Sequence, residues 1–451
     1  MPRWTILAVT ITCALVISST IHATDADSIA RGKKALETRS FTPAPWTFQA
    51  YDSAWENWQP KPEKQPADYD QAFRQRYGLH PAPFDNGKYP MGLRRGAFFG
   101  LPGIEGLTTD CMLCHGGSIL GKSYVGLGNA SLDIQAFFED LNLAAGITRK
   151  LPHTFSNVRG TSEAGAMAVY LHSFRNPDMS VRLVNRHNWP LPDTLCEDVP
   201  AWWLLKKKKT MYHTGGADAR SVRSIMQFML TPNNGLAVFE KEEPVFKDIQ
   251  GYLLSLEAPK YPFPIDAEKA ATGHKLFNKK CAQCHGTYGK EWTYPSKIVP
   301  LNVIGTDPTR FDGLPKELGE HYNQSWFAKE KPSGYKALES AGYQAPPLDG
   351  VWATAPYFHN GSVPTLYHVL NSKPRPKIFT RSFRTDESDY DKLNVGWKVQ
   401  ILDKMPADLS AHERRKIYDT TQPGRGNMGH TFGDDLSDAE RWAIIEYLKT
   451  L

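Results

Sequence analysis

Long apolar runs and a strong charge bias are both missing from most of this 451-residue chain. Beyond the first 23 residues no stretch approaches the roughly 20 apolar residues that span a bilayer, so we expect no membrane span in the mature chain. A formal net charge of +5 is small for this length and gives no sign of nucleic-acid binding. The length itself predicts two or three domains, each with its own core.

The N-terminus has the pattern of a secretory signal. Arg3 precedes an apolar run from Ile6 to Ile17, and small residues then offer a cleavage site after Ala23. The run is short for a membrane span. We therefore expect residues 1–23 to be removed and the chain to be periplasmic or secreted, with an uncleaved membrane anchor as the alternative.

The cysteine count does not fit a disulfide framework. Six cysteines are present, and five remain once Cys13 leaves with the signal, so they cannot all pair. Cys196 stands alone, and we expect it to be a buried free thiol. The other four form two CxxC pairs, each followed directly by a histidine: Cys111 and Cys114 before His115, and Cys281 and Cys284 before His285.

The two CxxCH motifs predict two covalent haem c groups. Cysteines at i and i+3 lie on one side of a helical turn, where both thiols can add to the vinyl groups of one porphyrin. The next residue, His115 or His285, then ligates the iron. Structural zinc is the alternative, but zinc sites do not regularly place a histidine directly after the second cysteine.

Helix signals flank the second motif. Asp266 can cap a helix that runs into Cys281, and Ser437 with Glu440 forms a capping box before a last apolar stripe. Gly273 would let these two helices approach closely. A further helix is expected to begin near Pro244, a favourable first-turn residue.

These signals predict a mainly α, loop-rich fold with two cytochrome c-like domains. The Pro-punctuated segment 257–264 cannot continue a helix and separates the domains. We expect an irregular, aromatic-rich N-terminal arm over 24–95, a first haem domain over 96–256 and a second over 265–451.

The second half also carries a family resemblance. The loop "PYFHNGSVPTL" (Pro356–Leu366) resembles the loop beside the C-terminal haem in the bacterial dihaem cytochrome c peroxidase superfamily. The closer resemblance is to rubber oxygenase A-like dihaem cytochromes c, which have a similar closing segment, here Asn427–Phe432 and Leu436–Leu451. The resemblance covers roughly residues 95–451 and is strongest in the second half.

The resemblance implies a ligand for the second haem. His430 matches the histidine opposite His285, and a bis-histidine haem suits electron transfer. Met428 and Met405 are the competing ligands. In the peroxidases a methionine ligand occupies the position of Lys373, which cannot bind iron while it is protonated, and this departure argues against a standard peroxidase.

The first haem is expected to lack a protein sixth ligand. In the peroxidases a histidine shortly after the first motif caps that iron, but no His or Met lies between His115 and His153 here, and Asn129 is a poor iron ligand. An open or water-bound haem can bind dioxygen or peroxide. The alternative is a ligand from elsewhere in the chain: His153, His172, His187 or His213.

Other functional residues are implied by the same resemblance. Trp202 and Trp203 resemble aromatics near the first haem that carry electrons or shape the pocket, with core packing as the equal alternative. His359 is implied to lie near the second haem, or else is a hydrogen-bonded loop histidine. Lys206–Lys209 are a solvated face, a docking patch for an acidic redox partner, or a clamp on haem propionates. A calcium ion between haem domains is common in the wider superfamily, but no ligand set here is specific enough to name.

The predicted function is therefore an exported dihaem c-type cytochrome oxidoreductase. The first haem would be open to dioxygen or peroxide, and the second would be bis-histidine and exchange electrons with a redox partner. Oxygenase-like action on an organic substrate is the favoured reaction. The alternatives are a dihaem cytochrome c peroxidase and a pure electron-transfer cytochrome.

Overall fold

The computed structural model describes residues 16–331 and 334–451. Most of the expected signal sequence lies outside the described residues, so that interpretation remains a prediction. Among the residues that are described, no helix combines the length and the apolar character needed to cross a membrane.

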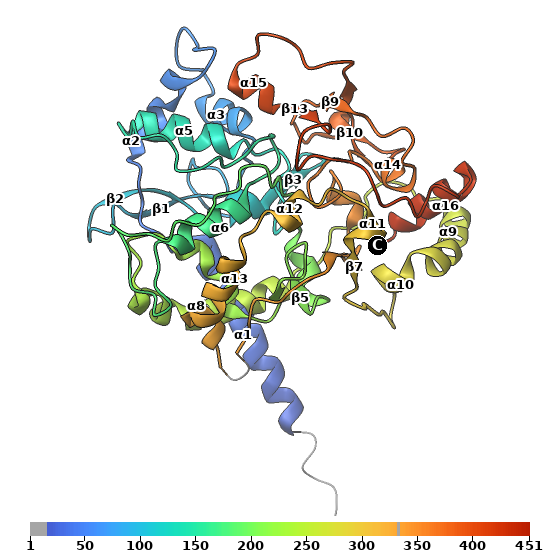
Figure 1. Cartoon of the computed structure of the whole chain (residues 1–451), viewed down its shortest axis with the longest axis horizontal. Coiled ribbons are helices and arrows are strands. Elements are labelled where there is room, and N and C mark those ends of the chain that lie inside the picture. The colour runs from blue at the N-terminus through green and yellow to red at the C-terminus, as the bar shows by residue number, and fades with distance from the viewer. Residues whose placement is uncertain (1–15, 332–333) are drawn as a thin grey trace, which may run out of the picture.

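Helices and loops dominate the regular structure, in agreement with the expected mainly α fold (Figure 1). The α-helices are α1 Val16–Thr38, α2 Phe48–Ser53, α3 Tyr69–Tyr77, α4 Met112–His115, α5 Ile134–Ala144, α6 Ala164–Ser173, α7 Val222–Ile225, α8 Leu236–Ser255, α9 Ala267–Lys280, α10 Ala282–His285, α11 Leu301–Ile304, α12 Thr309–Asp312, α13 Lys316–Gln324, α14 Leu366–Leu370, α15 Ala411–Arg415 and α16 Asp438–Leu448.

Strands are short and form small antiparallel sheets. Within the described residues each sheet has two strands, except the three-stranded sheet in the order β12-β9-β13. The strands are β1 Leu93–Ala97, β2 Glu105–Thr109, β3 Gly116–Ile119, β4 Lys122–Val125, β5 Thr210–Met211, β6 Ala217–Asp218, β7 Ile298–Pro300, β8 Gly342–Gln344, β9 Ile378–Thr380, β10 Tyr390–Asp391, β11 Gly396–Trp397, β12 Gln400–Ile401 and β13 Ile417–Asp419.

The second CxxCH motif is framed by two crossing helices, α9 and α16, which lie together at one end of the molecule (Figure 1). The Asp266 side chain caps α9 by accepting a hydrogen bond from the Lys269 N–H, and Ser437 and Glu440 form the expected capping box of α16. Gly273 lies at the crossing, where a Cβ atom would be only 1.9 Å from the Ala443 carbonyl oxygen.

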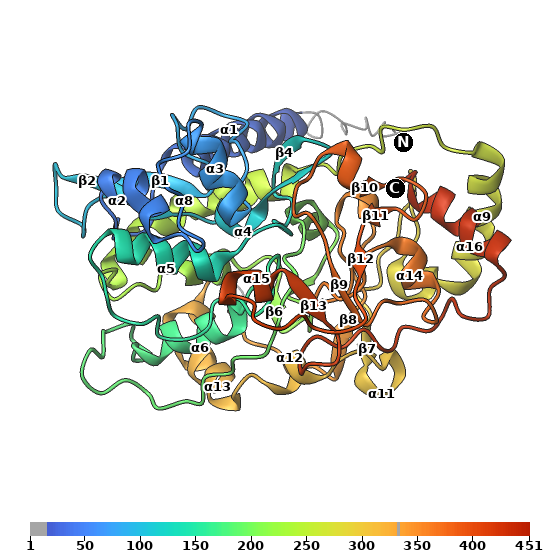
Figure 2. The ribbon, with the colours of Figure 1, turned by 90° about the horizontal axis from the view of Figure 1, so that it is seen from above.

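A second helix pair repeats this arrangement in the first half, where α1 packs along α8 (Figure 2). Gly32 of α1 lies so close to α8 that a Cβ atom would be 2.0 Å from the Asp248 carbonyl oxygen. The Asp248 carboxylate also accepts hydrogen bonds from Ser28 and Arg31. Each CxxCH motif thus has one helix before it and one after it in the chain, and these two helices pack against each other at a glycine.

Alanine at either glycine should destabilise the fold. We expect Gly32→Ala and Gly273→Ala each to lower the free energy of unfolding by about 1–3 kcal/mol or more, because the added methyl group overlaps a backbone carbonyl of the partner helix. Thermal melting of the purified protein would measure the loss. The matched control is Gly319→Ala in α13, where a Cβ atom meets nothing within 4 Å, and where alanine should stabilise the helix by about 1 kcal/mol. An unchanged melting temperature for Gly273→Ala would contradict the close crossing.

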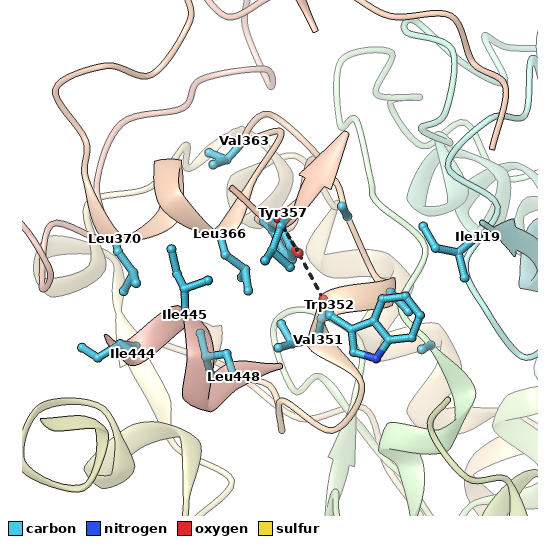
Figure 3. Close-up of a cluster of buried hydrophobic side chains, with 14 of the residues drawn as sticks. Ile119, Val351, Trp352, Tyr357, Val363, Leu366, Leu370, Ile444, Ile445 and Leu448 are labelled. Carbon is cyan, nitrogen blue, oxygen red and sulfur yellow. Dashed lines mark hydrogen bonds between the residues drawn. The ribbon is translucent and has the colours of Figure 1, made fainter. Parts of the chain in front are cut away.

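Two large hydrophobic cores lie on either side of the segment that contains Trp202 and Trp203. In the core of the second half, Ile444, Ile445 and Leu448 of α16 are directed at side chains from the 351–370 region (Figure 3). This core also takes in residues of the first half, including Ile119 of β3. A second core joins α1 and α8 to Trp202 and to the aromatic side chains around residue 326.

Two sequence expectations need correction. The helix expected to begin near Pro244 begins at Leu236, and Pro244 lies inside it; the local signal of a proline at a helix start was outweighed by packing of the earlier turns. The 24–95 segment is less irregular than expected, since it contains most of α1 together with α2 and α3. Its first helix packs with α8, so the arm begins as part of the body that contains α8.

Candidate haem sites

The second CxxCH motif forms a helical turn that continues from α9. Cys281 ends α9, and α10 carries Cys284 and His285. Both cysteines are free thiols and only partly buried. The Nδ1 atom of His285 donates to the Pro346 carbonyl oxygen at 2.8 Å. That hydrogen bond fixes the ring and leaves Nε2 as the nitrogen that can bind a metal.

His430 faces His285 across an open space. The two ring centroids are 6.3 Å apart, and the ring planes are inclined by 62°. Two metal–nitrogen bonds of about 2 Å each, added to the half-widths of two imidazole rings, give a separation of this size. The pair therefore has the spacing that a single iron between two histidines requires.

The loop that carries His430 is fastened from two sides. The His430 N–H donates to the Ile304 carbonyl oxygen at 2.7 Å. Gly429 packs against Gly305, where a Cβ atom would be 2.2 Å from the backbone carbon. Arg375 donates to the carbonyl oxygens of Asn427 and Gly429, both at 2.7 Å. His430 itself has a φ of +46°, a conformation that this fastened loop imposes.

Whether the histidines fit a haem iron depends on which ring nitrogen of each is accessible and whether it is unprotonated. The Nδ1 atoms of His115 and His430 are fully enclosed without a hydrogen-bond partner, whereas Nε2 is not enclosed in His115, His285 or His430. Burial lowers the pKa of His115 and of His430 to about 4, and it also lowers the pKa of His285. All three imidazoles are thus neutral near pH 7, with the lone pair of Nε2 directed into open space, and the donor set fits haem iron.

The competing ligands are less well placed. The Met428 side chain is 55% exposed, and Lys373, at the position of the peroxidase methionine, is exposed. Met405 is partly buried, in the loop before α15. The favoured ligand is therefore His430, whose ring lies opposite that of His285.

His359 lies away from this pair of histidines. Its ring stacks on Tyr343 at 4.0 Å and approaches His213 at 6.2 Å, and its Nε2 atom is fully enclosed. The neighbouring Phe358 is the residue of this loop that reaches His430, at 5.8 Å between ring centroids. The His359 side chain is thus packed against aromatic rings, and its enclosed Nε2 atom has no hydrogen-bond partner among the described residues, so a role near the second haem stays a prediction.

The first CxxCH motif is also a helical turn, α4, with Cys111 at its N-terminus. The Asp110 carboxylate accepts a hydrogen bond from the Met112 N–H at 2.8 Å and pairs with buried Arg94 at 2.8 Å. This arrangement fixes the start of the turn from the β1–β2 side. Asn129 donates to the Gly78 carbonyl and closes the far side, so its amide is occupied in holding the loop together.

Trp202 stacks directly on His115. The ring centroids are 4.7 Å apart and the planes differ by 22°. Trp203, the next residue, is packed in the other core, and its Nε1 atom donates to the Asp349 carbonyl at 2.8 Å. Asp349 lies three residues after Pro346, which holds His285. The two tryptophans thus connect the surroundings of one motif to those of the other.

The four distant histidines have other partners. Within the described ranges, no histidine ring faces His115 as His430 faces His285. The observed partners are Thr154 and Phe155 for His153, Gln227 for His172, Trp189 for His187, and the Asp198 carbonyl for His213.

Two remaining features concern the fifth cysteine and calcium. Cys196 is fully buried and unpaired, as expected, and burial raises the pKa of its thiol to about 12. Among the residues that the structure describes, no three or more His, Cys, Asp or Glu side chains are grouped so that they could hold a metal ion.

Similarity to known families supports a haem protein. Residues 342–380 match the model of a family described as RoxA-like, cytochrome c-like. The matched segment runs from β8 through the 356–366 loop to β9 and includes Pro346, Phe358 and Arg375, which surround the His285–His430 pair. It is similar to RoxA-like cytochromes c, and this similarity indicates a haem cytochrome with covalently bound haem c.

Two curated relatives come from Sinorhizobium fredii (strain NBRC 101917 / NGR234). The uncharacterized protein y4iM is 30% identical over 242 residues, which cover 45% of this chain and 53% of the relative. The uncharacterized protein y4iJ is 29% identical over 263 residues, which cover 44% of this chain and 41% of the relative. The alignments thus span about half the length of these relatives.

Sequence reasoning missed three residues that build these sites. Arg375 and Phe358 contact the His430 loop from segments distant in sequence, and no local pattern marks them. Gly32 had a readable signal: "ARGKKAL" (Ala30–Leu36) has the same spacing of Ala, Gly, Lys and apolar residues as "ATGHKLF" (Ala271–Phe277). Comparing the two stretches would have predicted that α1 corresponds to the helix before the second CxxCH motif.

Proposed function

We propose that this chain is an exported dihaem c-type cytochrome with oxidoreductase activity. Haem 1 would be attached at Cys111 and Cys114, with His115 as its only protein ligand, and would be open to dioxygen or peroxide. Haem 2 would be attached at Cys281 and Cys284. We further propose an oxygenase-like reaction on an organic substrate, with electrons supplied by a redox partner.

One observation carries this proposal: the two proximal histidines have different surroundings. His285 has a second imidazole at the spacing of a shared iron, whereas His115 has the Trp202 indole against its ring. A bis-histidine iron has no free position and serves electron transfer, while a single-histidine iron can accept a small molecule. The similarity of residues 342–380 to RoxA-like cytochromes c supports the oxygenase-like reaction over a simple carrier.

The residues of the chain then take distinct roles. Each haem supplies an iron that changes between the ferrous and ferric states. Trp202 restricts rotation of the His115 ring by stacking, and the Pro346 carbonyl orients His285 by accepting its Nδ1–H. Arg375 holds the His430 loop closed. Trp202 and Trp203 provide the aromatic route between the two sites.

Low-temperature EPR of the oxidised, fully loaded protein tests the proposal. We expect one high-spin and one low-spin ferric haem per chain, and one carbon monoxide bound per fully reduced chain. Two low-spin signals without carbon monoxide binding would overturn the open first haem and leave an electron carrier. Fast, saturable turnover of hydrogen peroxide with a reduced donor cytochrome, without oxygen-dependent oxidation of any organic substrate, would instead support a peroxidase.

A further inference from the structure

Lys206, Lys207 and Lys208 are consecutive, but their ammonium groups have different surroundings. Lys206 pairs with Glu257 at 2.6 Å, and Lys207 pairs with Asp349 at 2.7 Å. Lys208 is only 7% exposed, and among the described residues no carboxylate lies within salt-bridge distance of its Nζ atom. The most buried lysine of the three is thus the one without a protein counter-charge.

A buried ammonium without an anion is costly, because desolvation is not repaid by an ion pair. Burial lowers the pKa of Lys208 to about 8, which leaves it mostly protonated at neutral pH. Within the described ranges its Nζ atom has no hydrogen-bond partner, yet it is not among the fully enclosed polar atoms, so it borders open space. The interior therefore offers a positive charge to a ligand that occupies this space.

The chain on either side of Lys208 contacts the segments that hold the two proximal histidines. Its N–H donates to the Leu205 carbonyl, at the end of the short 3-10 helix η2 (Trp202–Lys206) that begins with the tryptophan stacked on His115. Two residues later, Thr210 accepts a hydrogen bond from Gln344, which lies two residues before Pro346, the partner of His285.

We propose that Lys208 is the counter-charge for a propionate of one of the two haems. This inference rests on the proposed function, because it needs a haem to supply the carboxylate. A propionate is an anion carried on a flexible arm at the haem edge, and an ammonium group binds it as a point charge. A cation held beside a haem disfavours the ferric state, which carries one more positive charge, and so raises the midpoint potential of that haem.

Spectroelectrochemical titration of the fully loaded protein tests the assignment. In Lys208→Met we expect the midpoint potential of one haem to shift downward, with the other nearly unchanged, and the melting temperature of the loaded protein to fall. Lys208→Arg should keep both potentials close to those of the unmodified chain. The matched control is Lys206→Met, which removes a neighbouring lysine already paired with Glu257 and should move neither potential.

Unmoved potentials in Lys208→Met would overturn the assignment. A raised melting temperature would also count against it, since removal of an unpaired buried charge would then be favourable. If Lys208→Met does not mature, Lys208→Gln removes the charge while keeping a hydrogen-bond donor and carries the same test. The haem content is measured first. A chain with fewer than two covalent haems contradicts the proposed function, whereas two haems with unmoved potentials contradict the role of Lys208 alone.

Discussion

Replacing Cys281 and Cys284 together by alanine should halve the covalent haem content, from about two haems per chain to one. In the proposed arrangement the thioether bonds of haem 2 would form only at these two thiols, which lie on one turn beside His285. The EPR spectrum of the variant should lose its low-spin signal and retain the high-spin signal. The pyridine haemochrome assay after removal of non-covalent haem measures the content.

The corresponding variant of the first motif shows which EPR signal belongs to which haem. Alanine at both Cys111 and Cys114 should also leave one covalent haem, but this variant should keep the low-spin signal and lose the high-spin one. The control is Cys196→Ala, which removes a buried thiol outside both motifs and should leave both haems attached. Full haem content in either double variant would contradict attachment at that motif.

Removing the imidazole of His430 should convert haem 2 from a six-coordinate to an open haem. Glycine is the suitable replacement, because the residue has a φ of +46° that glycine adopts without strain. In His430→Gly we expect the low-spin ferric signal to disappear and carbon monoxide binding to the reduced protein to rise from about one to about two molecules per chain. Both haems should stay attached, since neither thioether pair is altered.

Two further measurements show whether His430 itself is the ligand. Free imidazole should restore the low-spin signal of His430→Gly by entering the space that the side chain leaves. This test uses the variant that also lacks Cys111 and Cys114, because an open first haem would itself bind imidazole. Met428→Leu, which changes the competing ligand in the same loop, should leave the spectrum unchanged. A low-spin signal that survives in His430→Gly and is lost in Met428→Leu would assign the sixth position to the methionine.

The parts of the fold that the sequence predicts are those with local signals. The cap at Asp266, the capping box at Ser437 and the helical turn of the second motif each depend on residues within a few positions of one another. Gly273 could be interpreted because two nearby helix patterns required a close crossing. His430 was reached through the resemblance; its ring lies 6.3 Å from that of His285, and its role as a ligand stays a prediction.

The parts that the sequence did not predict depend on long-range packing. The 72 residues from Arg39 to Asp110 separate α1 from the motif it precedes, so α1 appeared to belong to a separate arm. The contacts of Arg375 with the His430 loop cross more than fifty residues. His359 packs on Tyr343, whereas the neighbouring Phe358 faces His430. Sequence periodicity cannot predict these two directions, because they depend on the backbone of one turn, where Phe358 has a φ of +71°.

The burial of Trp202 and Trp203 in two different cores restricts how the two halves of the molecule can move. The two residues are consecutive, yet the first indole is buried in the core that contains α1 and α8, and the second in the core that contains α9 and α16. Sliding one half of the molecule past the other would pull at least one indole out of its core, at a cost of about 3–5 kcal/mol. The dipeptide therefore anchors the two cores to each other at a fixed spacing. We expect the two halves to unfold together in one cooperative step.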